Sequence, residues 1–311
     1  MNQVVTELSC EGWPIIYGEV LFDTFPDGTS VMGGAPFNVA WHLQGFGLSP
    51  LLISAVGQDI QGKKVLQIMC DWGMDIQGMQ IDTSHPTGAV NVSLDTGQPT
   101  FTIVPEQAYD FIEPGPVQKI INHTPVSLLY HGSLAARSQR SYDTLMLLRA
   151  SANKPVFVDI NLRAPWWNRN VVHKLITHAN WLKLNDDELI KLTSDDNAAH
   201  GLSDAAQTIF DRYQLTLLVV TRGKAGAFVI SKEGRRDGQP LVVNQIADTV
   251  GAGDAFSAVT LLGLLHDWAL SDVLQRALQF AAMICAVRGA TIQDKSLYQN
   301  LLKQWQQADD N

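Results

Sequence analysis

The chain has 311 residues, of which 46% are hydrophobic and 17% are charged, so it can bury a sizeable core and is not expected to be disordered. Its formal net charge of -9 repels phosphate backbones and anionic membranes, which argues against nucleic acid or a membrane as a partner. The 3 cysteines lie far apart without a C-x-x-C spacing, which argues against a disulfide framework or a thiolate zinc site and favours the cytoplasm.

Short apolar runs alternate with amphipathic segments along the chain. The first apolar run predicts one strand over 14–23, and a helical pattern opens at Gly33 and continues through Gly45. Further strands are predicted at 51–56, 126–131, 156–160, 181–184 and 217–221, and further helices at 58–72, 138–150, 171–178, 204–213, 252–265 and 271–288. Buried strands separated by helices predict a single α/β domain over 1–311, with a mostly parallel sheet covered by helices on both faces.

Residues 87–104 break this alternation. They alternate apolar and polar side chains, are rich in Val and Thr, and contain an Asp95-Thr96-Gly97 turn, a pattern that predicts an antiparallel hairpin. Residues 20–32 can supply further strands beside it. We expect these two segments to form a small β lid over the ligand edge of the sheet. The alternative is a hairpin on the edge of the main sheet itself.

The run Gly251-Ala252-Gly253-Asp254 stands directly before a long apolar helical pattern. Glycines let the backbone approach a ligand closely, and a helix N-terminus presents unpaired N–H groups and a positive dipole end. Together they suit the charge that develops on a transferring phosphoryl group. Asp254, in the first turn, can accept the proton of an attacking hydroxyl. The alternative for these four residues alone is an ordinary helix start.

A second glycine pair, Gly33 and Gly34, leads into the first predicted helix. There the backbone can press against a ligand, and the Asn38 side chain can both donate to and accept from sugar hydroxyls. Asp23, at the end of the first predicted strand, can accept hydrogen bonds from two vicinal hydroxyls. Its alternative is a turn residue.

Two more candidate sites follow predicted strands. Asn185 and Glu188 share a helix face and form a capping box, or they hold waters on Mg²⁺; the residues alone favour the capping box. Thr221 and Gly223 form a turn that contacts nucleotide phosphates, or a β-hairpin, or both. Arg163 follows the strand at 156–160 and either contacts substrate or pairs with a carboxylate.

The segment 57–64 nearly matches the P-loop pattern G-x-x-x-x-G-K-[ST]. Lys64 stands where the Mg²⁺-binding hydroxyl belongs, and Asp59 places a negative charge where phosphates would sit. We therefore reject a P-loop. The histidines form no H-E-x-x-H, so no zinc site is expected, and the absence of G-x-S-x-G leaves serine hydrolase chemistry without support.

Taken together, these residues resemble the ribokinase-like, or PfkB, family of carbohydrate kinases, over about 16–290. Segments 33–43 and 248–257 are similar to the two family signatures, and 18–23, 34–38 and 159–163 look most like fructokinases in that family. The resemblance implies a three-layer α/β/α Rossmann-like fold with a β lid, and an enzyme that uses ATP and Mg²⁺.

The resemblance also assigns roles to the candidate residues. Asp254 would be the catalytic base, with Gly251, Ala252 and Gly253 as the anion hole; Asp23, Gly33, Gly34, Asn38 and Arg163 would face the sugar; Asn185 and Glu188 would support Mg²⁺ and the phosphates; and Thr221 and Gly223 would face ATP. Asp248 and Thr249 match a region that binds K⁺ in some members, which leaves activation by K⁺ open.

The expected activity is transfer of the γ-phosphoryl group to a sugar hydroxyl, with fructose as the leading substrate. The segment 105–110 and Phe37 depart from the fructokinase pattern near the sugar. The alternatives are a 2-keto-3-deoxygluconate kinase, a nucleoside kinase, and an inactive sugar- or nucleotide-binding regulator, although the last is expected to lack Asp254 or the glycines. An exposed hairpin edge makes a homodimer through the lid an open alternative to a monomer.

Overall fold

The computed structural model describes residues 12–93, 100–194, 201–239 and 246–309, and the strands there form two sheets. The larger sheet contains β1 (Trp13–Tyr17), β4 (Leu51–Gly57), β5 (Met79–Asp82), β8 (Val126–His131), β9 (Val156–Asp159), β10 (Trp181–Asn185), β11 (Leu217–Thr221), β12 (Ala227–Ser231) and β13 (Gly234–Gly238). Its spatial order is β13-β12-β11-β10-β9-β8-β1-β4-β5; β12 runs antiparallel to both β11 and β13, and the other neighbouring pairs are parallel.

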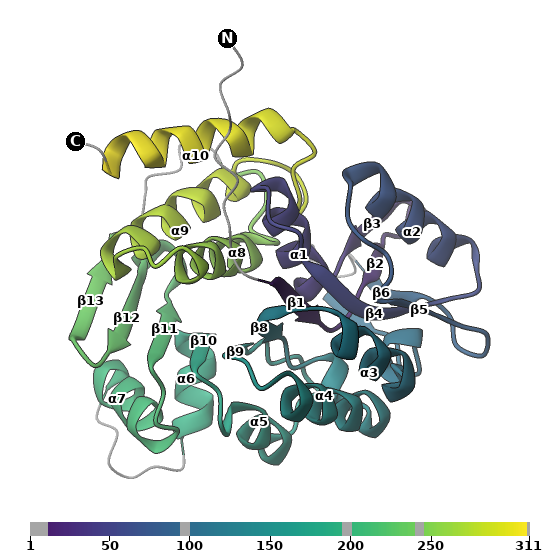
Figure 1. Ribbon diagram of the computed structural model, residues 1–311, viewed down its shortest axis with the longest axis horizontal. Coiled ribbons are helices and arrows are strands. Elements are labelled where there is room, and N and C mark those ends of the chain that lie inside the picture. The colour runs from purple at the N-terminus through teal and green to yellow at the C-terminus, as the bar shows by residue number, and fades with distance from the viewer. Residues whose placement is uncertain (1–11, 94–99, 195–200, 240–245, 310–311) are drawn as a thin grey trace.

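Helices cover both faces of this sheet (Figure 1). One layer contains α1 (Ala35–Gly45), α2 (Ile60–Trp72), α8 (Ala252–Leu265), α9 (Leu270–Cys285) and α10 (Lys295–Asp309). The other contains α3 (Pro114–His123), α4 (Gln139–Ala152), α5 (Arg169–Ile176), α6 (Asp186–Thr193) and α7 (Leu202–Arg212), with the short 3-10 turns η1 (Ala108–Phe111) and η2 (Ala135–Arg137). The expected three-layer α/β/α fold is confirmed.

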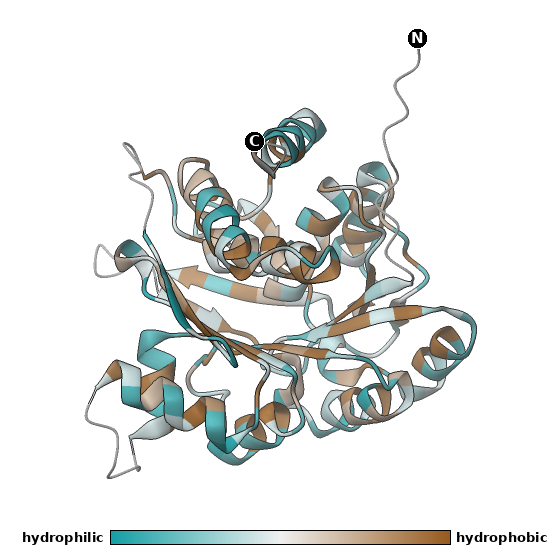
Figure 2. Cartoon of the chain, turned by 60° about the vertical axis from the view of Figure 1, so that its left-hand side comes forward, coloured by the Kyte–Doolittle hydropathy of each residue, from teal (hydrophilic) through white to brown (hydrophobic). Residues whose placement is uncertain are grey.

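Two hydrophobic cores lie between these layers, one on each face of the sheet. Alternate side chains of a strand point to opposite faces, so Ile15 and Tyr17 of β1 enter one core and Ile16 enters the other. Every residue of β4 is buried. Figure 2 shows mainly apolar central strands lying between helices that carry both apolar and hydrophilic residues. Burial on both faces explains why these strands read as nearly continuous apolar runs.

The single strand expected over 14–23 is wrong. The chain leaves the main sheet after Tyr17 and enters the second sheet at Leu21. Gly18 lies between them with φ 151, and a Cβ there would lie 2.4 Å from Cγ of Pro36. This close approach to the start of α1 requires glycine and breaks the strand. The pattern also missed α3, α10, β5 and β13; β13 is almost wholly exposed, so it has no apolar period to detect.

The second sheet consists of β2 (Leu21–Thr24), β3 (Ser30–Gly33), β6 (Gly88–Ser93) and β7 (Thr100–Ile103), in the order β3-β2-β6-β7. It therefore joins the two segments from which the lid was expected. β6 and β7 pair in antiparallel fashion, and β2 pairs with β6 in parallel. The turn expected at Asp95-Thr96-Gly97 lies outside the described residues. These strands belong to a separate sheet and do not extend the main one.

The loop before α2 anchors this second sheet. Asp59 caps α2 by accepting from the Gly62 amide over 2.7 Å, and it also accepts from the amide and hydroxyl of Thr87, just before β6. The glycine-rich segment 57–64 thus has a structural role, which agrees with rejecting a P-loop. In the ranges that the structure describes, no helix is long and apolar enough to cross a membrane.

Candidate active site

The candidate residues converge on the carboxyl ends of the parallel strands, the edge at which open α/β sheets bind ligands. Asn185 at the end of β10 lies in register with Thr221 at the end of β11. Asp159 ends β9, and Lys183 of β10 is its partner in register. Residues far apart in the sequence are therefore neighbours because the strands that precede them are paired.

The N-terminus of α8 faces the same edge. Gly251 is its N-cap residue, with φ 81, and a Cβ there would lie 2.4 Å from Cβ of Ala290. Only glycine combines this backbone conformation with such close packing. Ala252, Gly253 and Asp254 form the first turn, where backbone amides lack partners within the helix. The geometry is that of a helix N-terminal anion site with a carboxylate beside it.

Asp254 is half-buried at this helix end, and Asn38 of α1 donates from Nδ2 to its Oδ2 over 2.7 Å. Burial raises the pKa of Asp254 to about 6. The hydrogen bond from Asn38 and the positive charges of Lys183 and Arg163 lower this pKa, whereas the negative charge of Asp159 raises it. The carboxylate is therefore a stronger proton acceptor than an exposed aspartate and remains largely ionised at neutral pH.

A buried polar network lies beneath the first turn of α8. Lys183 Nζ donates to Asp159 Oδ1 over 2.7 Å, and Asp159 Oδ2 accepts from Ser257 at 2.5 Å and from Tyr130 at 3.0 Å. A Cβ on Gly253 would lie 3.7 Å from Lys183 Nζ. Sequence reasoning did not identify Lys183. A lysine inside an otherwise apolar central strand was the available signal, since a buried charge requires a partner.

Asp23 lies in β2 of the second sheet, not at the end of a main-sheet strand as expected. Burial raises its pKa, the charge of Arg163 lowers it, and the charge of Asp248 raises it. Arg163 also acts on Asp254, so its guanidinium carries positive charge to both carboxylates. A Cβ on Gly33 would lie 3.7 Å from Asp23 Oδ2. The charge of Arg163 therefore lowers the pKa of Asp254 as well as that of Asp23.

Asn185 and Glu188 form the capping box of α6. Asn185 Oδ1 accepts from the Glu188 amide over 2.8 Å, and Glu188 Oε2 accepts from the Asn185 amide over 2.9 Å. Glu188 Oε1 accepts from the Leu162 amide over 2.9 Å, and burial raises the pKa of Glu188. With a backbone amide on each oxygen, this carboxylate is suited to contacting Mg²⁺ through water rather than directly. In the described ranges, no group of three or more His, Cys, Asp or Glu side chains could hold a metal ion.

The remaining sequence candidates lie in turns. Thr221 ends β11, and Gly223 begins a 3-10 turn, Gly223–Ala225, that leads into β12, so these residues form the expected hairpin. Asp248 accepts from the Val250 amide over 3.0 Å, and the carbonyl of Thr249 accepts from the Ala252 amide over 3.4 Å. Asp248 and Thr249 therefore lead directly into the N-terminus of α8.

Three buried residues near the site were missed by sequence reasoning: Glu19, Tyr109 and Arg137. Glu19 follows Gly18 in the chain segment that joins the two sheets, Tyr109 lies in η1 and Arg137 ends η2. Burial raises the pKa of Glu19 to about 7, with the charge of Asp254 acting in the same direction and the charge of Arg137 against it. Their turns have no regular period, so only the fold brings them together.

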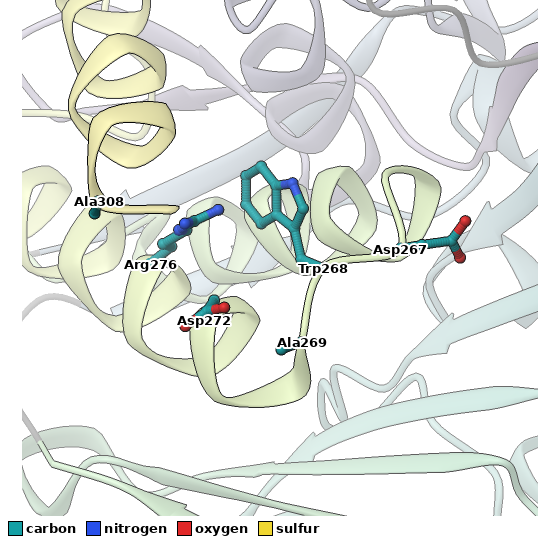
Figure 3. Close-up of a pocket in the computed structure, with 6 residues that line it drawn as sticks. All are labelled: Asp267, Trp268, Ala269, Asp272, Arg276 and Ala308. Atoms are coloured by element: carbon teal, nitrogen blue, oxygen red, sulfur yellow. The ribbon is translucent and has the colours of Figure 1, made fainter. Parts of the chain in front are cut away.

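One surface pocket lies elsewhere. It is lined by Asp267, Trp268, Ala269, Asp272, Arg276 and Ala308 (Figure 3). The pocket lies where the loop after α8, the first turns of α9 and the end of α10 meet. Asp254 is in the first turn of α8, whereas Asp267 follows its C-terminal end, and at a rise of about 1.5 Å per residue this 14-residue helix is about 20 Å long. The pocket is therefore distinct from the candidate active site.

Comparison with known proteins gives a consistent result. The pfkB family carbohydrate kinase profile matches residues 16–296. The chain is 29% identical to a fructokinase of Klebsiella pneumoniae, covering 80% of this chain and 83% of the relative. It is 28% identical to a fructokinase of Salmonella typhimurium, covering 88% of this chain and 94% of the relative. A fructokinase double mutant from Vibrio cholerae O395, solved with fructose, ADP and a potassium ion bound, superimposes with a TM-score of 0.79 at 25% identity, covering 94% and 99% of the two chains.

Proposed function

The chain belongs to the pfkB family of carbohydrate kinases, and on that basis we propose that it phosphorylates fructose with ATP. The observation that carries the proposal is the position of Asp254, a carboxylate held by Asn38 in the first turn of a glycine-flanked helix. Fructose is the proposed substrate because two of the relatives that the chain matches are fructokinases.

Asp254 is proposed as the general base. Its carboxylate accepts the proton of the attacking sugar hydroxyl while Asn38 holds it in place. The first-turn amides of α8, with the glycines Gly251 and Gly253, stabilise the negative charge on the phosphoryl oxygens. Asp23 and Arg163 are proposed to bind sugar hydroxyls. Chemistry of this kind depends mainly on positioning and electrostatics.

ATP is proposed to lie over the ends of β10 and β11, where Asn185 and Thr221 are in register and Gly223 follows. Mg²⁺ bound to the phosphates supplies positive charge there, and Glu188 fits contact with it through water. Asp248 and Thr249 are proposed to hold K⁺, because they lead into the anion site.

The cytoplasm is the proposed location. Val31 and Phe101, both exposed on edge strands of the second sheet, support a proposed homodimer through that sheet.

A coupled assay of ADP release tests the proposed substrate. Fructose, ribose, 2-keto-3-deoxygluconate, tagatose phosphate and adenosine are offered in turn with Mg²⁺, with and without K⁺. The proposal expects the largest kcat/KM with fructose. Highest turnover on ketodeoxygluconate or adenosine would replace fructose by that substrate, and no turnover on any of them would favour a sugar- or nucleotide-binding regulator.

A further inference from the structure

Lys183 has hydrogen-bonding capacity to spare beneath the first turn of α8. Along β10 it alternates with Leu182 and Leu184, which enter the core on the opposite face of the sheet, so its side chain points toward the layer that contains α8. Its ammonium group donates to Asp159 Oδ1 over 2.7 Å. An ammonium group has three N–H donors, and within the ranges that the structure describes Asp159 is the one acceptor that Lys183 reaches. The side chain is 7% exposed, so its other donors need a partner.

Asp159 fixes the position of this ammonium group. Its Oδ2 accepts from Ser257 of α8 at 2.5 Å and from Tyr130 of β8 at 3.0 Å, which leaves Oδ1 for Lys183. The carboxylate is therefore tied to both the helix and the sheet, and its negative charge is shared among several donors. Lys183 is in place before any ligand binds, and a donor that is positioned in advance loses little entropy on binding.

The ammonium group borders an open space in front of the first turn of α8. Gly253 is exposed, and a Cβ built on it would have Lys183 Nζ as its one described neighbour beyond the local backbone, at 3.7 Å. Ala252, Gly253 and Asp254 begin the helix there, so their amides lack partners within it. A lysine ammonium and a helix N-terminus thus meet at one exposed point, and both are donors that suit a phosphoryl group.

We propose that Lys183 is a further catalytic residue, which donates from Nζ to an oxygen of the phosphoryl group as this passes from ATP to the sugar. The bond between the γ-phosphorus and the oxygen that bridges to the β-phosphate breaks, and its electron pair stays on ADP. A bond from the sugar oxygen to the phosphorus forms, and the proton of that hydroxyl goes to Asp254. Lys183 gives up no proton in this step and stabilises the negative oxygens by a charge-assisted hydrogen bond. The inference rests on the proposed sugar kinase function and adds a residue to its mechanism.

A purely structural role, in which Lys183 serves only to neutralise Asp159, is the alternative. The two roles differ in what happens when both charges are removed. Lys183→Met alone leaves a buried carboxylate without its partner and should destabilise the fold. Combining it with Asp159→Asn removes that uncompensated charge and should restore most of the stability. The contact with the phosphoryl group is lost in both proteins, so only a catalytic role keeps the double variant impaired.

The test compares wild type, Lys183→Met, the double variant with Asp159→Asn, and Lys303→Met, which replaces an exposed lysine of α10. Calorimetry at pH 8 measures the affinity of each protein for Mg²⁺-ADP and for Mg²⁺-β,γ-imido-ATP, which carries the third phosphoryl group but does not transfer it. Loss of a hydrogen bond to a charged group should weaken binding of the imido analogue about 10- to 100-fold in both Lys183 variants. Binding of ADP should stay within about 3-fold of wild type, and Lys303→Met should change neither.

Turnover gives the second measurement. In sugar-dependent ADP release at pH 8, the double variant should lose at least roughly 100-fold in kcat, as expected for removal of one donor to a developing oxyanion. A double variant that melts like wild type and keeps the wild-type ratio of the two affinities would overturn the role of Lys183. The double variant decides even if Lys183→Met alone does not fold. If wild type phosphorylates no sugar, the proposed function fails, whereas the two nucleotide affinities still decide on the contact of Lys183, because they need no sugar.

Discussion

Asn38 donates a hydrogen bond from Nδ2 to Oδ2 of Asp254 over 2.7 Å, and this contact joins α1 to the N-terminus of α8 across 216 residues of sequence. The glycine pair before α1 and the glycine run before α8 are thereby parts of one site. The bond also opposes the effect of burial, which raises the pKa of Asp254 to about 6. Asn38 is therefore in a position to set the pH at which Asp254 becomes a base.

Replacing Asn38 by Ala should shift the pH dependence of the reaction. A base must be ionised, so kcat/KM of wild type should fall as the pH drops through about 6. Without the donor, the carboxylate loses a stabilising partner, its pKa rises, and the acidic limb should move to higher pH. A pH profile of kcat/KM measures this, with exposed Asn122→Ala of α3 as the control. A limb that stays in place or moves down would contradict the assignment.

The buried ion pair of Lys183 and Asp159 beneath α8 predicts that replacing either partner shifts the pKa of Asp254, in opposite directions for the two replacements. Lys183 lowers the pKa of Asp254 and Asp159 raises it. Lys183→Met should therefore move the acidic limb of kcat/KM to higher pH, and Asp159→Asn should move it to lower pH. Both variants should also lose about 3–5 kcal/mol of stability, because each leaves a buried charge without its partner. Pairing the pH profiles with thermal melting separates the two effects, and limbs that move in the same direction would count against the pair as an electrostatic regulator of Asp254.

The two glycines flanking Ala252 should respond differently to a methyl group. A Cβ on Gly253 is exposed and meets only Lys183 Nζ at 3.7 Å, so Gly253→Ala should fold as well as wild type. It should nevertheless lower kcat by roughly 100-fold, because the methyl group lies where phosphoryl oxygens approach.

Gly251→Ala should instead destabilise the fold by about 1–3 kcal/mol, since its φ is 81 and the new Cβ would lie 2.4 Å from that of Ala290. Melting temperatures and kcat for both variants check this. A fully active Gly253→Ala would remove the anion site from the mechanism.

The ionised carboxylate of Asp254 should also lower the free energy of unfolding at pH values above its pKa. Its folded pKa of about 6 lies above the ordinary value for aspartate, so the folded state binds the proton more tightly than the unfolded state does. Stability should therefore decrease as the pH rises toward 6, and the cost should persist above it. Asp254→Asn should be more stable than wild type at pH 8 by about 1–2 kcal/mol, and the difference should shrink toward pH 4. Denaturant unfolding at the two pH values measures it, and an equal difference at both would contradict the charge as its cause.

The sequence predicted well those parts of the molecule that depend on local periodicity. The central strands and most helices follow from apolar runs, and the Asn185–Glu188 capping box follows from residue types three positions apart. The adjacency of Asn185 and Thr221 depends instead on strand register. Asp23 was misplaced because the apolar run through Gly18 conceals a change of sheet.

The residues missed at the site are those whose importance depends on long-range packing. Glu19 lies in the irregular connection between β1 and β2, Tyr109 and Arg137 lie in short 3-10 turns, and Lys183 is concealed within an apolar strand. Their partners are distant in sequence, as in the contact of Arg137 with Asp110 and that of Lys183 with Asp159. A buried charge implies that a partner exists, but only the fold identifies which residue it is.

The most direct test of the central claim compares wild type with Asp254→Asn in sugar-dependent ADP release. With ATP, Mg²⁺ and the best sugar saturating, the variant should lose at least roughly 100- to 10,000-fold in kcat, as expected for removal of a general base. Its affinity for the sugar, measured by calorimetry, should stay within about 10-fold of wild type, because Asn38 can still donate to the amide oxygen that replaces a carboxylate oxygen. Near-normal turnover in a folded Asp254→Asn protein would contradict the assignment of Asp254 as the base.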